Sequence, residues 1–284
     1  MMKKQKLKFG LILLMLSATF FIACDKDDEM QEDLTVEAID LKTAETEAVI
    51  DEASDEASVI IEEAYQTEEY PATKSNALER YLPDCVTITK VITQNMKTVT
   101  IDFGEGCELR NGNFVSGAII MEYEKNPEVA TKTISYTYRN FYFNRKHVEG
   151  GGSILRERMN SNGNPQSTKT FDVTVTWPDE SYAKKEGVKI REMIEGKGTK
   201  AWGDNVFLIT GNWKFTRKNG TVLSATVIEA LRRELACKFL VSGVIELVKN
   251  ENTALLYYGD GSCDDLATIS VNGGPRREIH LSNL

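Results

Sequence analysis

The feature that most constrains the fold is a succession of short runs in which β-branched or aromatic residues alternate with polar ones. From Leu82 onward Gly, Asn and Asp residues separate these runs, which include 86–93, 98–103, 131–138, 171–177 and 240–248. Alternation places every second side chain on one face of a strand, and turn residues between such runs indicate antiparallel connections. The sequence therefore predicts a mainly β fold, either an antiparallel sheet or a β-sandwich with hairpin repeats. Residues 227–235 fit a short helix or a strand equally well.

The cysteines divide into one near the N-terminus and four in the β region. Cys85 and Cys237 each open a strand, and each returning strand ends in an aromatic-Gly-acid-Gly sequence followed by Cys107 or Cys263. The repeated pattern suits two similar hairpins, so of three possible connectivities it favours Cys85–Cys107 and Cys237–Cys263. A four-cysteine zinc site is the alternative, but the chain has no pair of cysteines two to four residues apart, which such sites use.

Glycines recur inside the predicted strands. The elements Phe114–Gly117, Leu208–Gly211 and Leu240–Gly243 repeat an apolar-x-Gly pattern, and His147–Gly150 is a looser copy. A glycine within a strand indicates a bulge or a close approach of two backbones. The run Gly150–Ser153 is instead predicted to be a turn, because it lacks the strand and helix that flank a glycine-rich phosphate-binding loop.

The first 24 residues read as a secretion signal. Lys3 to Lys8 form a basic segment, and residues 11–22 form an apolar run that is too short for a bilayer-spanning helix, which needs about 20 residues. Phe21-Ile22-Ala23-Cys24 resembles the lipobox of bacterial lipoproteins, in which the cysteine is acylated and becomes the N-terminus. We expect residues 1–23 to be removed and Cys24 to anchor the protein to the membrane by lipid. The alternative is a plain secretory peptide with an incidental cysteine.

A strongly acidic segment follows Cys24. Residues 25–69 contain 18 acidic residues against two lysines, whereas the remainder of the chain is close to neutral. Residues 24–44 are predicted to be a lipidated tether, and residues 45–79 an acidic amphipathic helix or spacer preceding the β domain at 80–284. The apolar stripe of this helix is Val49, Ala53, Ala57, Ile60 and Ala64, and its acidic face is expected to be solvated. The acids lack the spacing of calcium-binding loops.

Few residues point to chemistry. There is no nucleophile elbow, phosphate-binding loop or basic stripe with interleaved aromatics, so we expect no enzyme activity, no cofactor and no nucleic-acid partner. Asp260, Ser262 and Asp264 alternate as in calcium loops, but position 271 is Val, so a hairpin turn is favoured over a metal site. Tyr138, Phe141, Tyr142 and Phe143 form the most exposed-looking aromatic cluster and are the candidate surface for a protein or glycan ligand. The alternative for these aromatics is a core position.

The chain resembles uncharacterised surface lipoproteins of Bacteroidetes in its lipobox and acidic tether, in the acidic helix ending near Leu82–Cys85, and in the segments Asp102–Cys107, Asn140–Asn144 and Gly261–Thr268. The resemblance implies a location on the outer membrane, exposed at the cell surface, and a β fold. It implies no activity. The sequence predicts a binding or structural module. An accessory to outer-membrane assembly or lipid handling is the alternative, and a surface glycan hydrolase is the third class.

Overall fold

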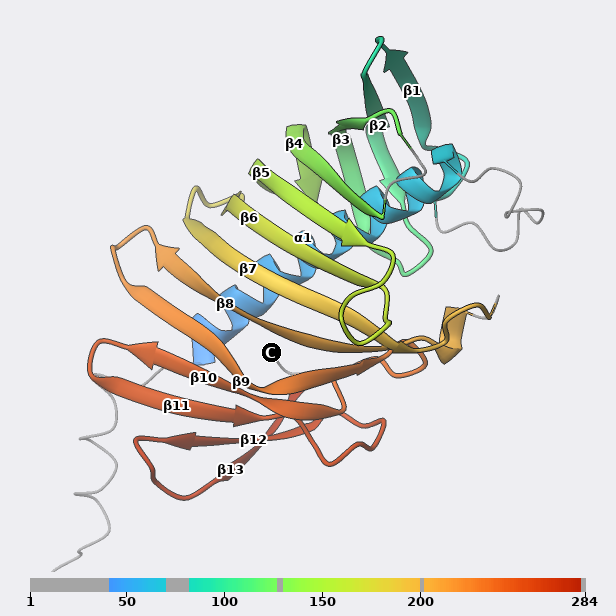
Figure 1. Cartoon of the computed structure of the whole chain (residues 1–284). Coiled ribbons are helices and arrows are strands. Elements are labelled where there is room, and N and C mark those ends of the chain that lie inside the picture. The colour runs from blue at the N-terminus through green and yellow to red at the C-terminus, as the bar shows by residue number, and fades with distance from the viewer. Residues whose placement is uncertain (1–40, 70–81, 127–129, 200–201, 282–284) are drawn as a thin grey trace, which may run out of the picture. The chain divides into compact units, whose positions relative to one another are not determined.

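The computed structural model describes residues 41–69, 82–126, 130–199 and 202–281; Cys24 and the tether up to residue 40 lie outside the described residues. Residues 38–284 form one compact unit. Its described part contains the helix α1 (Leu41–Glu69), a 3₁₀ turn at Trp202–Asp204 and thirteen strands (Figure 1). The strands are β1 (Thr87–Ile92), β2 (Met96–Glu108), β3 (Phe114–Glu124), β4 (Thr131–Phe143), β5 (Lys146–Glu157), β6 (Gln166–Thr176), β7 (Tyr182–Glu195), β8 (Val206–Arg217), β9 (Val222–Glu234), β10 (Ser242–Lys249), β11 (Asn252–Tyr257), β12 (Leu266–Val271) and β13 (Arg277–His280).

All thirteen strands form a single antiparallel sheet in which each strand pairs with the next along the chain. The prediction of a mainly β fold is confirmed, and of the two architectures left open the fold is a sheet, not a sandwich. The ambiguous segment at 227–235 belongs almost entirely to β9. Figure 1 shows α1 crossing the strands on one face of the sheet, which is called the inner face below.

The inner face contains the hydrophobic core. In β4 the buried residues Lys132, Ile134 and Tyr136 alternate with exposed ones, as expected for a strand with one covered face. The helix adds Ile60 and Tyr65, which are at most 1% exposed. The predicted stripe is buried wherever its side chains are described, at Ala53, Ala57, Ile60 and Ala64. The helix thus supplies the second layer that an isolated sheet face needs.

Two of the predicted strand glycines lie at irregularities of the sheet. The pairing register shifts at Gly117 and at Gly243, and both residues have positive φ values of 77° and 110°. A Cβ atom on Gly117 would lie 1.8 Å from the carbonyl oxygen of Asn140. The prediction of bulges and close approach is confirmed at these positions.

The prediction that Gly150–Ser153 is a turn is wrong, because these residues lie inside β5. The glycines are required by packing rather than by a reversal. A Cβ on Gly152 would lie 2.1 Å from the Thr170 oxygen of the next strand and 2.9 Å from the Tyr136 hydroxyl. Glycine therefore makes room on the inner face for the Tyr136 side chain.

Both predicted disulfides are present. The Cα atoms of Cys85 and Cys107 are 5.8 Å apart and those of Cys237 and Cys263 are 5.2 Å apart, within the range of disulfides. Cys85 lies just before β1 and Cys107 lies near the end of β2, whereas Cys237 lies in the β9–β10 connection and Cys263 in the β11–β12 connection. Neighbouring strands run in opposite directions. The first hairpin begins at an odd-numbered strand and the second at an even-numbered strand, so the two bonds lie at opposite ends of the strands.

Candidate functional site

Acidic residues seven positions apart connect α1 to basic residues on the inner face. Glu69 accepts a hydrogen bond of 2.7 Å from Lys97 of β2. Glu62 pairs with Arg156 of β5 through two hydrogen bonds of 2.6 and 2.7 Å. Seven residues are about two helical turns, or roughly 10 Å, so the acids lie along one side of the helix and meet successive strands. The expectation that the acidic face of this helix is solvated is wrong for Glu62, which pairs with Arg156. It is also wrong for Glu56, which is 7% exposed and accepts hydrogen bonds from Asn111 and Asn113.

Asp55 continues this row and lies between two lysines of the sheet. Its carboxylate oxygens are 3.4 Å from Lys169 Nζ on β6 and 3.3 Å from Lys189 Nζ on β7. Lys169 also donates hydrogen bonds of 2.7 Å to the Ser54 carbonyl and to the Ser58 hydroxyl. Burying an ammonium group is costly unless it is paired and hydrogen-bonded, and these contacts supply both requirements.

The sheet carries more basic residues at inner positions than sequence reasoning identified. They alternate along their strands in the same phase as the buried apolar residues, so they belong to the inner face. The set is Lys97, Lys132, Arg156, Lys169, Lys185, Lys189, Arg191 and Arg233. Lys185 and Lys189 contact Trp213, with Nζ atoms 4.6 and 5.0 Å from the ring centroid, so this tryptophan lies in the core. A signal was present in the sequence: Lys97, Lys132 and Lys169 each stand two residues before an apolar residue that begins an alternating run.

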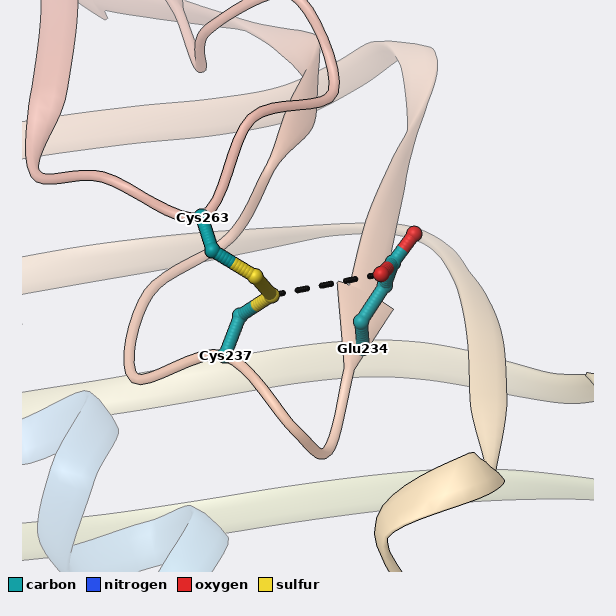
Figure 2. Close-up of side chains that lie close together, drawn as sticks. All are labelled: Glu234, Cys237 and Cys263. Carbon is teal, nitrogen blue, oxygen red and sulfur yellow. Dashed lines mark hydrogen bonds between the residues drawn. A yellow bond between two sulfur atoms is a disulfide. The ribbon is translucent and has the colours of Figure 1, made fainter.

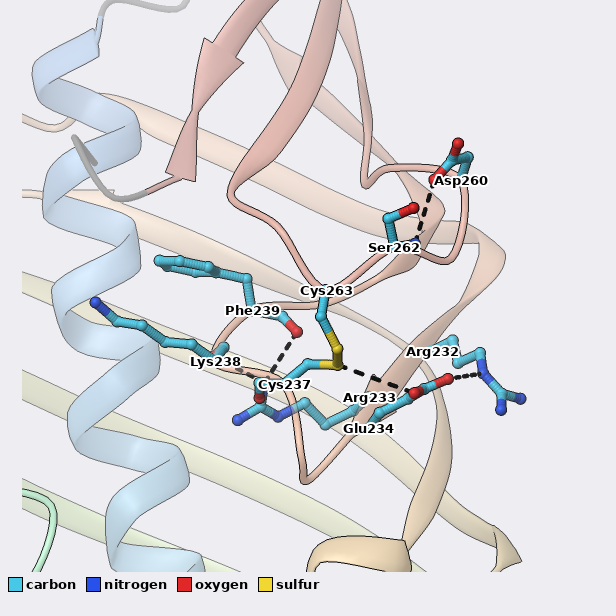
Figure 3. Close-up of a disulfide and its surroundings, with 9 residues drawn as sticks. All are labelled: Arg232, Arg233, Glu234, Cys237, Lys238, Phe239, Asp260, Ser262 and Cys263. Carbon is cyan, nitrogen blue, oxygen red and sulfur yellow. Dashed lines mark hydrogen bonds and ion pairs between the residues drawn. A yellow bond between two sulfur atoms is a disulfide. The ribbon is translucent and has the colours of Figure 1, made fainter.

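One of these basic residues, Arg233, forms hydrogen bonds with the connection between β9 and β10. Arg233 Nη1 donates to three successive carbonyl oxygens, those of Cys237, Lys238 and Phe239, at 2.8, 2.8 and 3.0 Å. Figure 3 shows Arg233 beside this connection, together with the adjacent Cys237–Cys263 disulfide. The guanidinium and the disulfide therefore hold the same short connection from two sides.

Glu234, Cys237 and Cys263 are close enough together to suggest a metal site. Their potential ligand atoms all lie within 4.8 Å of one another. Figure 2 shows, however, that the two sulfur atoms are bonded to each other, with Cys237 Sγ 3.9 Å from Glu234 Oε2. Metals bind cysteine as the free thiolate, so in the oxidised protein this group is not a metal site.

The predicted aromatic surface is mostly interior. Phe141 and Phe143 are fully buried, and Tyr138 stacks on Phe141 with ring centroids 5.3 Å apart. Only Tyr142 is exposed, at 40%, and it stacks on His147 at 4.7 Å. The expectation of an exposed cluster is therefore wrong for three of the four residues. The alternation of β4 turns Tyr138, Phe141 and Phe143 inward, because an irregularity near Asn140 shifts the register between them.

The weak metal candidates between β11 and β12 serve the turn itself. Asp260 Oδ1 accepts a hydrogen bond of 3.2 Å from the backbone nitrogen of Ser262, and hydrogen bonds from the side chain and the backbone of Ser262 lower the pKa of Asp260. Asp264 Oδ1 accepts one of 3.0 Å from the nitrogen of Leu266. Asp side chains commonly stabilise turns by bonding a backbone nitrogen two residues on, as both do here. The structure brings the three residues into one exposed connection, with each described contact made to the backbone or within the turn, and Figure 3 shows the contact of Asp260 with Ser262.

Two further findings concern the whole described chain. No helix in the described ranges is both long enough and apolar enough to cross a membrane. Comparisons with protein-family models, with curated proteins and with solved structures find no match.

Proposed function

We propose that this chain is a lipoprotein of the outer membrane, held at the cell surface by acyl chains on Cys24, whose body is a non-enzymatic binding module. The basic segment, the short apolar run and the terminal cysteine of residues 1–24 support the anchor. Two disulfides in the body agree with an oxidising compartment.

One observation carries the binding role. α1 is fixed to the inner face by buried apolar side chains and by the Glu69–Lys97, Glu62–Arg156 and Asp55–Lys169 pairs, which makes the unit a filled, rigid scaffold. The long connections 158–165, 235–241 and 258–265 lie at one end of the strands. Tight turns at 144–145 and 250–251 lie at the opposite end. Long connections on a rigid scaffold are where proteins commonly place binding residues.

Lipid handling, the alternative, would require an apolar cavity for acyl chains. One hollow among the described residues has a volume of about 360 Å³, is open, and lies over β7, β8 and β9. Its lining includes the charged Glu186 and Lys214 beside Trp213 and Ala225, so this open hollow does not enclose an acyl chain. This observation favours the binding module over a lipid carrier.

The anchor is tested by replacing Cys24 with Ser and fractionating cells. We expect the wild-type protein in the outer membrane and accessible to protease on intact cells, and the variant in the soluble fraction. Retention of the variant in membranes that only detergent dissolves would contradict the anchor. Protection of the wild-type protein from protease on intact cells would contradict surface exposure.

A further inference from the structure

Arg191 occupies an unusual position on the inner face. It lies near the end of β7, and its guanidinium carbon is 3.7 Å from the centroid of the Phe207 ring on β8. Its Nε is buried, and within the described residues it has no hydrogen-bond partner. Burial is also the main cause that lowers the pKa of Arg191. A buried charged donor without an acceptor is rare in folded proteins and requires an explanation.

A second arginine flanks the same aromatic ring. Arg233 of β9 is the register partner of Phe207, so the two side chains lie directly across from each other on the inner face. The three carbonyl oxygens of residues 237–239 fix its guanidinium in place, and Arg233 is close enough to lower the pKa of Arg191. Two like charges thus lie near one ring. In Figure 3 the side chains of Lys238 and Phe239 extend toward α1, on the same side of the connection.

The nearest acids do not neutralise this pair by contact. Asp55 and Glu62 of α1 raise the pKa of Arg191 through their charge, yet neither forms a hydrogen bond with it in the described structure. Asp55 contacts Lys169 and Lys189, and Glu62 contacts Arg156. The carboxylates are therefore engaged elsewhere. Asp55 is 52% exposed, so solvent reaches this side of the helix.

We propose that Arg191, Phe207 and Arg233 form a binding site for a phosphate-class oxyanion beside α1. The planar guanidinium fork matches phosphate oxygens with two parallel hydrogen bonds, and stacking on Phe207 fixes the plane in which the donors of Arg191 lie. A bound dianion would satisfy Arg191 and offset the repulsion between the two arginines. Free phosphate and the phosphate of a lipid headgroup share this chemistry. The inference deepens the proposed binding role by naming its ligand class.

The experiment uses the full chain carrying Cys24→Ser, so its result does not depend on whether the anchor exists. Isothermal titration with inorganic phosphate is compared with sodium chloride at equal ionic strength. We expect saturable binding of phosphate alone, at least a tenfold loss of affinity in Arg191→Gln, and a several-fold loss in Arg191→Lys, which retains charge without the fork. Arg139→Gln is the control, because Arg139 is 53% exposed and pairs with Asp102 away from this site.

A second arm distinguishes the sources of phosphate. The same proteins are sedimented with phosphatidylcholine vesicles that contain or lack phosphatidic acid. Binding to phosphatidic acid that depends on Arg191, without binding of free phosphate, assigns the site to a lipid headgroup and supports the proposal. Equal heats with phosphate and chloride together with no vesicle binding overturn it, and so does an equal loss of affinity in Arg139→Gln. Where Arg191→Gln fails to fold, Arg191→Lys carries the comparison with Arg139→Gln, and a wild-type protein that binds neither probe overturns the proposal without any variant.

Discussion

At the scale of single residues, Lys169 shows how a cation is accommodated in this core. Its side chain is 8% exposed, and its ammonium group bonds Ser54, Ser58 and Asp55 of α1. Lys169→Met keeps the length of the side chain but removes these hydrogen bonds, so we expect a loss of about 1–3 kcal/mol in the free energy of unfolding. Lys184→Met is the matched control. Lys184 is 40% exposed and pairs with acids on the other face, where such pairs contribute less than about 1 kcal/mol. Equal losses in urea titrations would contradict this assignment.

Tyr136 and Tyr138 present a different case: their buried hydroxyls lie close to each other and have no other hydrogen-bonding group in the described part of the chain. Burial raises the pKa of both phenols above their usual 10. The folded state therefore retains protons that the unfolded chain releases, so the contribution of these two phenols to stability is constant below pH 10 and falls as the pH rises beyond it, by up to about 1.4 kcal/mol per unit for each tyrosine. The double variant Tyr136→Phe/Tyr138→Phe should be as stable as the wild type at pH 7 and lose less stability at pH 11.

Thermal unfolding between pH 7 and pH 11 checks this expectation. Some alkaline loss should remain in the double variant, because burial and the hydrogen bond to Glu69 also raise the pKa of Tyr123. Burial lowers the pKa of Lys132, which acts with the opposite sign, but this lysine is unchanged in both proteins. Identical pH profiles for the two proteins would show that the buried phenols do not control alkaline stability.

At the scale of elements, α1 is part of the core and not a spacer. Ile60 is completely buried against the inner face, whereas the neighbouring Val59 is partly exposed. Ile60→Ala removes three buried carbon atoms and leaves a cavity, so we expect it to cost about 2–5 kcal/mol. Val59→Ala, on the open side of the helix, should cost less than about 1 kcal/mol. The midpoints of denaturant unfolding measure both, and a similar small loss for each would mean that α1 packs only loosely on the sheet.

The sequence identifies this helix but not its role. The stripe at Ala53, Ala57, Ile60 and Ala64 predicts the buried side, because apolar spacing of three and four is a local property. The pairing of Glu62 with Arg156 joins residues 94 positions apart, and nothing local to either residue specifies it. Acidic side chains of isolated helices are usually solvated. They become structural here only because the partner surface carries lysines and arginines at inward positions.

At the scale of the whole molecule, alternation predicts that each strand has one covered face but not what covers it. A second sheet or a helix can bury the same alternating side chains, so the sequence does not distinguish a single sheet covered by a helix from a sandwich of two sheets. The proposed oxyanion site could not be predicted from the sequence for the same reason. Arg191, Phe207 and Arg233 come from three strands, and their proximity depends on the register of β7, β8 and β9. The cysteine pairs were predictable because the same pattern, a strand opened by Cys and a return that ends in aromatic-Gly-acid-Gly before a second Cys, occurs twice.

The two disulfides allow a prediction that joins stability to binding. Each closes a loop of 22 or 26 residues, so removing either bond by paired Cys→Ser changes should cost about 3 kcal/mol by the entropy of loop closure. The bonds hold hairpins nine strands apart, and effects of such distant changes usually add.

The two double variants should differ in their affinity for phosphate. Cys237–Cys263 holds the connection whose carbonyl oxygens fix Arg233, so Cys237→Ser/Cys263→Ser should also weaken phosphate binding. Cys85→Ser/Cys107→Ser should leave phosphate affinity unchanged while lowering the unfolding midpoint by a similar amount. Urea titration and phosphate calorimetry on both proteins separate the two effects, and an equal loss of phosphate affinity in both would mean that it reflects general loosening and not the position of Arg233.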